Sequence, residues 1–220
     1  GGAAAVAAGV PLLPAPLVLP RYPITLLLPS FAYGIALLGL NLLFGTTGLL
    51  SFGHALFVAL GAYTAAYLTT GLGVRHFELV LAGAMLAAVI VALPVGLLCV
   101  RYVKIYFGML TLAFGMVFYT FLVKFYRLTG GDEGMRVLRP LLLGHDFAGL
   151  GKTAYLAGPY YYYSLALLAL AALAMWRIIG SPFGLCLRTI RDNPLKAEAL
   201  GIGVTRYRWY AFVISGVYGA

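Results

Sequence analysis

The feature that most constrains this chain is an interval of 53 residues, from Tyr22 to Val74, that contains no charged side chain. As a single helix rising about 1.5 Å per residue it would be about 80 Å long, whereas a bilayer core is about 30 Å thick. A membrane-embedded interval of this length must reverse direction within itself. Its one cluster of turn-forming residues is Gly45-Thr46-Thr47-Gly48, so we expect the chain to fold back there.

The composition places the chain in a membrane. Hydrophobic residues make up 63% of the 220 residues, charged residues only 10%, and the mean hydropathy is +0.98, whereas about a quarter of the residues of a soluble domain are charged. The charge-free intervals predict an all-α fold, a polytopic transmembrane helical bundle with about six complete spans and the start of a seventh. The expected spans are 3–20, 24–44, 48–69, 79–100, 105–126 and 159–179, followed by a segment from 207 onward.

The first 20 residues have a rival interpretation as a signal-like segment. They contain four prolines in their second half, but they have neither a basic beginning nor a convincing cleavage site. Because the chain starts without Met and stops within an apolar stretch, we expect it to be part of a longer protein whose C-terminal part is missing. Residues 1–220 then form a single transmembrane domain.

The distribution of Lys and Arg predicts the orientation. The loop from Arg177 to Arg208 contains six basic and two acidic residues, so it is expected to be cytoplasmic. Counting spans back from it places the 101–104 turn on the same side and the 127–158 loop outside, in the periplasm. This topology accounts for much of the net charge of +9, and no soluble domain is present to carry a nucleic-acid-binding patch. Cys99 and Cys186 fall on or near the reducing cytoplasmic side, so neither a disulfide nor a metal site is predicted.

Small residues recur at helical spacing in three predicted spans, as is typical of contact faces between membrane helices. Pro29 and Pro94 lie inside spans, where a proline removes a backbone hydrogen bond and bends or interrupts the helix. Interrupted helices suit a translocation path better than a passive anchor, although packing alone remains an alternative for either proline. The predicted contact faces are Ala84, Ala88, Ala92 and Gly96; Ser51, Ala55, Ala59, Ala62 and Ala66; and Gly108, Thr111 and Gly115.

Asn41 and His54 are polar residues within predicted spans. Asn41 shares a helical face with Ser30 and Gly34, His54 shares one with Gly61, and the connecting turn allows both faces to point into one interior. Such residues are functional candidates, and interhelical hydrogen bonding is the alternative. No second histidine or carboxylate lies inside a predicted span, which disfavours haem ligation, proton relay, ion-coupled transport and intramembrane catalysis. No catalytic residue is predicted.

The stretch 181–208 reads as an ordered polar module. Ser181 and Pro182 are helix-start signals. The apolar residues that follow share one helical face and the arginines lie off it, as in a short amphipathic helix. Asp192-Asn193-Pro194 ends that helix and caps a second one, which runs to Leu200 and stops at Gly201. A piece this small has no core of its own, so we expect it either to dock on a partner or to lie on the membrane surface.

Four ordered stretches carry a family resemblance. Together they resemble the inner-membrane permease subunits of branched-chain amino acid ABC transporters, with urea-type permeases as close relatives. The stretches are GLNLLFGTTGLLSFGHALFVALGAYTAAYL (39–68), IYFGMLTLAFG (105–115), TGGDEGM (129–135) and SPFGLCLRTIRDNPLKAEALGIGVTRYRWYAFVISG (181–216).

The resemblance implies a multi-pass permease of the bacterial inner (plasma) membrane that imports branched-chain, hydrophobic amino acids by alternating access. Its implied partners are a second permease subunit, cytoplasmic ATPase subunits that use ATP and Mg, and a periplasmic substrate-binding protein. The permease itself would bind no cofactor and catalyse no reaction. Import of urea or short amides, or secondary transport without ATP, are the alternatives.

The resemblance also implies roles for particular residues. The 180–206 loop would couple the permease to the ATPase, and the 127–158 loop would face the binding protein. The expected coupling residues are Arg191, Ala197, Glu198, Ala199 and Gly201. The expected residues of the outer loop are Gly130, Gly131, Asp132 and Glu133, and those of the substrate path are Asn41, Ser51 and His54.

Overall fold

The structure is a computed structural model that describes residues 21–102, 105–125, 155–156 and 158–220, together with residues 129, 130, 135, 137 and 141. All elements in this part of the chain are helical, apart from one isolated β-bridge between His76 and Leu141. The predicted all-α class is confirmed. The predicted span at 3–20 lies outside the described residues.

The helices follow the charge-free intervals closely. Four of them are long and apolar enough to cross a bilayer: α3 (Arg21–Asn41) with its continuation η1 (Leu42–Thr47), α5 (Phe77–Cys99), α6 (Ile105–Lys124) and α9 (Pro159–Gly180). Two further helices, the apolar α4 (Ala55–Thr70) and α12 (Val204–Gly219), which begins with a basic stretch, have 16 residues each, or about 24 Å at 1.5 Å per residue. The predicted number of complete spans is therefore not confirmed.

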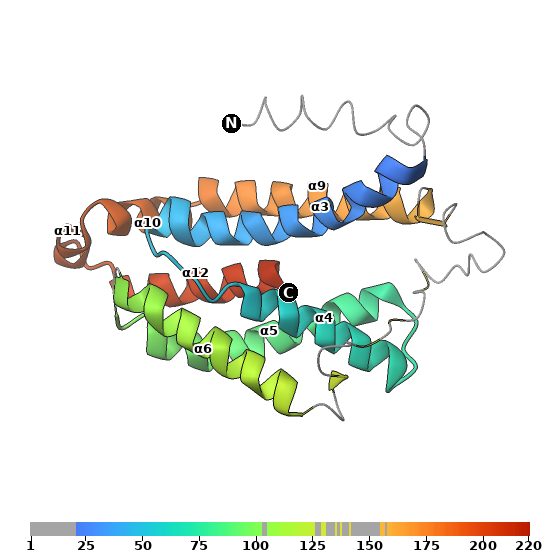
Figure 1. Cartoon of the computed structure of the whole chain (residues 1–220). Coiled ribbons are helices and arrows are strands. Elements are labelled where there is room, and N and C mark those ends of the chain that lie inside the picture. The colour runs from blue at the N-terminus through green and yellow to red at the C-terminus, as the bar shows by residue number, and fades with distance from the viewer. Residues whose placement is uncertain are drawn as a thin grey trace.

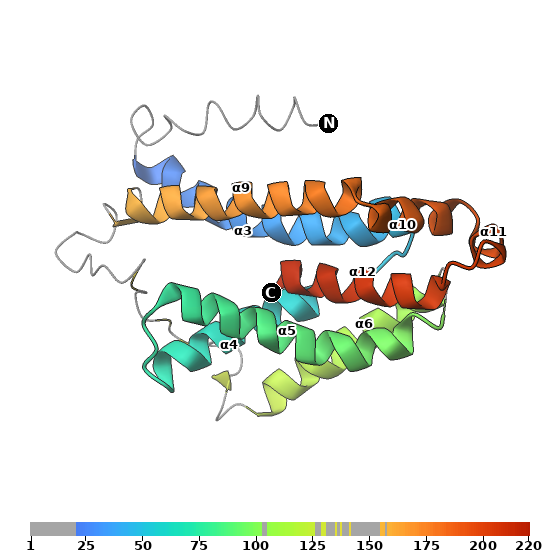
Figure 2. The ribbon, with the colours of Figure 1, turned by 180° about the vertical axis from the view of Figure 1, so that it is seen from behind.

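The bundle has two sides with α12 between them. Figures 1 and 2 show α3 and α9 lying side by side, α4, α5 and α6 on the opposite side, and α12 running between the two groups. The contacts agree, because α12 packs against both α3 and α5. The Ser215 hydroxyl of α12 donates a 2.6 Å hydrogen bond to the Gly39 carbonyl of α3, and the Phe212 ring packs edge-on against Phe107 of α6.

The predicted stripe on α5 is confirmed as a contact face. Ala84, Ala88, Ala92 and Gly96 are all buried, and Gly96 lies against the rings of Trp209 and Phe212. Helix α5 continues through Pro94, and α3 continues through Pro29. The interruption expected at a proline occurs elsewhere, in the segment that follows Gly48.

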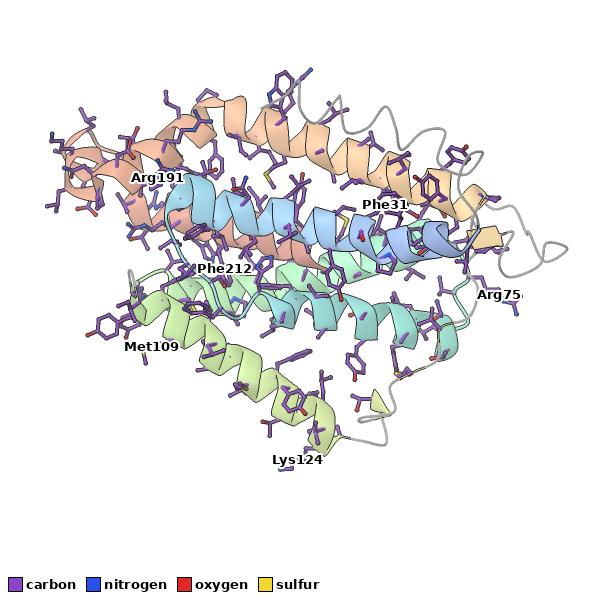
Figure 3. The ribbon with its side chains drawn as sticks, turned by 45° about the horizontal axis from the view of Figure 1, so that its top comes forward. Phe31, Arg75, Met109, Lys124, Arg191 and Phe212 are labelled. Carbon is purple, nitrogen blue, oxygen red and sulfur yellow. The ribbon has the colours of Figure 1, made fainter. Side chains whose placement is uncertain are left out.

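The connections between the helices lie at the two ends of the bundle. The end of η1, the end of α5, the start of α6 and the short helices α10 (Pro182–Asp192) and α11 (Pro194–Ala199) gather at one end. The α4–α5 turn, with Arg75, lies at the other, opposite Arg191 (Figure 3). This arrangement matches the predicted fold-back at Gly45–Gly48. The basic loop that predicts the cytoplasmic side lies at the end that holds α10 and α11.

Candidate translocation site and coupling module

The most unusual backbone in the bundle is the connection between η1 and α4. Helix α3 continues past its expected end at residue 44 by widening into the π-helical turn η1, in which the Thr47 hydroxyl donates a hydrogen bond to the Leu42 carbonyl at 2.9 Å. Gly48 then adopts a left-handed conformation with φ +73° and ends the helix. Residues 49–53 are not helical, and α4 starts only at Ala55. The predicted helix start at residue 48 is therefore wrong.

This connection, residues 49–54, is called the re-entrant segment below. Six residues can extend over at most about 20 Å, which is more than half of a bilayer core about 30 Å thick. In Figure 1 the segment runs back from the end of η1 into the bundle, and α4 begins near the end of α12. Irregular backbone at membrane depth is tolerated where protein or a watery cavity surrounds it.

Helix α6 supplies the partner for this irregular backbone. The backbone N–H of Phe52 donates to the Thr111 hydroxyl at 3.3 Å. Gly53 lies so close to α6 that a Cβ atom placed on it would be 2.0 Å from the Thr111 carbonyl oxygen. Gly108 contacts the Phe52 ring, and Gly115 lies opposite Gly53. The predicted small-residue stripe of α6 is thus a contact face for the re-entrant segment.

Ser51 and His54 lie within this segment and are nearly removed from solvent, each with 8% of its surface exposed. Neither the Ser51 hydroxyl nor either nitrogen of His54 has a hydrogen-bond partner within the described residues. The imidazole packs edge-on against Phe57, with ring centroids 5.7 Å apart, and its Nε2 atom faces Gly219 of α12. Burying polar atoms without a partner costs free energy, so these two residues are the strongest candidates for contact with a polar substrate group.

Asn41 does not join them. Its side chain is exposed and its carboxamide oxygen lies against Gly45 of the same helix, while Ser30, on the same predicted face, is also exposed. The buried residues are instead Phe31, Gly39 and Leu42. The expectation that Asn41 and His54 point into one interior is wrong, because the buried face of α3 is rotated from the one predicted. Likewise, Ala55 and Ala62 are exposed, since α4 starts too late to continue the stripe from Ser51.

The module of α10 and α11 is built largely as predicted. Ser181 lies at the junction of α9 and α10 and, instead of capping α10 with its side chain, donates its hydroxyl to the Ile178 carbonyl at 2.6 Å. Leu187 and Ile190 of α10 are buried, and Phe183 stacks on Tyr207 of α12 with ring centroids 5.6 Å apart. The predicted amphipathic face of this helix is confirmed.

Helix α11 projects from the end of the bundle (Figure 2). The Asn193 side chain caps it by accepting a hydrogen bond from the Lys196 backbone N–H at 3.1 Å. Ala197 is fully buried against Ile190 and Val204. Three other expected coupling residues, Glu198, Ala199 and Gly201, are exposed. The first two lie between two leucines with large exposed surfaces, Leu195 (77%) and Leu200 (75%), and Gly201 directly follows the second leucine.

Arg191, the fifth expected coupling residue, turns toward the membrane part of the protein. Its guanidinium donates a hydrogen bond to the Gly45 carbonyl in η1, and its aliphatic stem lies against Gly48. Its Nε atom is 3.5 Å from Asp192. No pattern in the sequence predicts this contact, which joins residues 146 positions apart.

Comparison with known proteins decides the family. The profile of a family described as the permease component of branched-chain amino acid transport systems matches residues 22–220. The chain belongs to this permease family. It is 28% identical over 207 residues to the high-affinity branched-chain amino acid transport system permease protein LivM of Salmonella typhimurium, and equally to LivM of Escherichia coli. Each alignment covers 86% of this chain and 48% of the relative, so the chain spans about half the length of these curated relatives.

Shorter alignments connect the permease to relatives with other named substrates. The guanosine ABC transporter permease protein NupQ of Bacillus subtilis is 34% identical over 74 residues, which are 34% of this chain and 23% of NupQ. The nucleoside ABC transporter permease protein NupC of Lactococcus lactis is 42% identical over 52 residues, which are 24% of this chain and 16% of NupC. No solved structure matches the chain significantly.

The permease is a multi-pass protein of the inner membrane and a transport component, not an enzyme. Within the described ranges, no three His, Cys, Asp or Glu side chains are grouped so that they could hold a metal ion. Of the expected outer-loop residues only Gly130 is described, with φ +72°. Gly131, Asp132 and Glu133, like most of the 127–158 loop, lie outside the described residues.

Proposed function

We propose that this permease forms half of the membrane path of an ATP-driven importer of branched-chain amino acids. A second permease subunit completes the path, separate cytoplasmic ATPase subunits hydrolyse ATP with Mg, and a periplasmic binding protein delivers the substrate. The observation that carries the proposal is the family match across residues 22–220, combined with a short capped helix that projects from the basic end of the bundle.

The projecting helix α11 suits an ATPase contact. Leu195 on this six-residue helix and Leu200 directly after it expose apolar side chains, and Glu198 lies between them. Exposed apolar residues gathered with a few polar ones are typical of protein interaction sites. Because Ala197 anchors the helix to α10 and α12, a force on α11 would pass to the rest of the module.

Ser51 and His54 are the proposed substrate contacts. They provide one hydroxyl and one imidazole, both without a partner in the described structure, on irregular backbone between α6 and α12. Neutral hydrogen-bonding groups of this kind can hold an amino acid weakly, as transport requires release on the far side. Asn41 is left out of this proposed contact set because its side chain is exposed on α3.

A second candidate substrate class is nucleosides. The NupQ and NupC alignments favour nucleosides over urea or short amides, because none of the matched relatives is named as a urea or amide permease. The LivM alignments cover 86% of this chain, compared with 34% for NupQ and 24% for NupC, and they favour amino acids.

Uptake by the complete transporter in proteoliposomes tests both parts of the proposal. Labelled leucine, guanosine and urea are offered with and without internal ATP, and we expect ATP-dependent accumulation of leucine. Leu200→Asp should abolish accumulation at unchanged membrane levels, because it puts a charge into the ATPase contact. Leu72→Asp, which adds the same charge to an exposed leucine at the opposite end of the bundle, is the control. Uptake that needs no ATP, and that survives both Leu200→Asp and Glu198→Ala, would instead identify a secondary transporter.

A further inference from the structure

The contact between Arg191 and η1 joins the cytoplasmic module to the membrane path. Its guanidinium donates to the Gly45 carbonyl, close to the end of η1. The last carbonyls of a helix lack intrahelical partners and carry a partial negative charge, so a cation is stabilised there. The same side chain fills the space beside Gly48, where a Cβ atom would lie 2.6 Å from Arg191 Cγ. One side chain therefore makes a polar and a steric contact with the same turn.

The module that carries Arg191 is internally well connected. Asn193 caps α11 directly after α10, and Ile190, Ala197 and Val204 form a buried cluster that joins α10, α11 and the start of α12. Arg191 follows Ile190 in the chain, so it lies beside this cluster. A displacement of α11 relative to the bundle would therefore carry the Arg191 side chain with it.

The turn that Arg191 holds leads directly into the re-entrant segment. Gly48 ends η1 in the left-handed conformation, and Ser51 and His54 follow within six residues. Single π-helical turns are rare and occur often at functional sites. Arg191 thus contacts the turn that precedes the segment, and Thr111 of α6 holds the Phe52 backbone within it.

We propose that Arg191 is a positioning residue that transmits movement of the α10–α11 module to the re-entrant segment, and so links ATP use to the exposure of Ser51 and His54. This inference rests on the proposed function. Arg191 would act through the turn at Gly45–Gly48, not through direct contact with the ATPase. Loss of the guanidinium should therefore leave ATP hydrolysis running while import fails.

The test compares Arg191→Gln with Arg188→Gln in the complete transporter. Arg188 is exposed on the same helix and makes no hydrogen bond within the described residues, so its variant changes the charge equally without touching η1. The measured quantity is the ratio of ATP hydrolysed to labelled leucine imported. We expect Arg191→Gln to raise this ratio about tenfold, because the loss of one hydrogen bond from a charged group is large enough for a change of that size. Arg188→Gln should keep the parent ratio. Gly48→Ala disturbs the same contact, because the added Cβ would collide with the Arg191 stem. This variant replaces Arg191→Gln in the test if the latter does not assemble.

A second measurement reports movement of the segment itself. Leu50, which is 42% exposed, is replaced by cysteine, and the two native cysteines are removed as Cys99→Ala and Cys186→Ser. Labelling of the new cysteine by a water-soluble maleimide is then followed with and without ATP and vanadate. Nucleotide should change the labelling in the parent and in Arg188→Gln but not in Arg191→Gln. An unchanged ATP-to-leucine ratio in Arg191→Gln, or a parent that imports leucine without any labelling change, would overturn the inference. A parent without ATP-driven uptake would instead refute the proposed function.

Discussion

Replacing Gly53 with alanine tests whether the re-entrant segment lies against α6 as closely as the structure shows. The added Cβ would be 2.0 Å from the Thr111 carbonyl oxygen and 2.5 Å from its carbonyl carbon, whereas a carbon normally approaches a carbonyl oxygen to about 3.3 Å. Backbone atoms of α6 cannot rotate away, so the segment would have to move by more than about 1 Å. Gly53 does not have a positive φ, so alanine adds no conformational strain of its own.

The magnitude follows from two opposing terms. Overpacking of a close contact costs about 1–3 kcal/mol, and the reduced freedom of the unfolded chain returns about 0.4–1 kcal/mol. The middle values of the two ranges leave a net destabilisation of about 1.3 kcal/mol. For a chain of this size that lowers the midpoint of thermal unfolding by about 3–5 °C.

The assay is thermal unfolding in detergent, followed by the loss of the monodisperse protein from size-exclusion chromatography. Gly115→Ala is the matched control, because its Cβ would be at an ordinary 3.6 Å from Gly53 Cα and alanine is favoured over glycine within a helix by about 1 kcal/mol. We expect its midpoint to equal or exceed that of the parent. If Gly53→Ala were as stable as Gly115→Ala, the close packing of the segment on α6 would be refuted.

Two further substitutions have separable effects. Ser51→Ala should leave the unfolding midpoint unchanged or higher, because the hydroxyl that it removes makes no hydrogen bond within the described residues. The same substitution should lower leucine uptake, and unchanged uptake would remove Ser51 from the proposed path. Ser215→Ala removes the hydrogen bond that joins α12 to α3 and should cost about 0.6 kcal/mol, at most about 1.7 kcal/mol, measured as a lower unfolding midpoint. Ser164→Ala, whose hydroxyl bonds only within α9, is the control, and an equal effect of both substitutions would contradict the interhelical contribution.

The ends of the long helices were predictable because charge has a large and local effect in a membrane. Helix α5 begins and ends within two residues of the expected 79–100, and α9 begins at the expected residue 159 and ends at 180. Charged residues outside these intervals cannot enter the hydrocarbon core without a large cost. The module of α10 and α11 was predictable for a different reason, since Pro182, Asn193 and Gly201 act on the backbone next to them.

The re-entrant segment was not predictable from the same reasoning. Apolarity indicates that residues 49–54 lie in the membrane, but it does not specify whether their backbone is helical. The group that accepts the Phe52 backbone N–H is the Thr111 hydroxyl, 59 residues away, and a single sequence contains no signal of that pairing. The burial of His54 was expected, whereas the exposure of Asn41 was not, because the buried face of α3 depends on where α9 and α12 pack.

The short length of the segment makes its two attachments interdependent. Six residues cannot extend beyond about 20 Å, so a shift of Gly48 must be absorbed by the backbone dihedrals of residues 49–52 or by the bond between the Phe52 N–H and Thr111. That bond is long, at 3.3 Å, and the Thr111 hydroxyl that accepts it also donates to the Gly108 carbonyl at 2.8 Å, a bond within α6 that does not depend on Phe52. It is therefore the contact that would yield first when the module pulls on η1. The residues between the two attachments, Ser51 among them, would then change their exposure while α3 and α6 themselves stay in place.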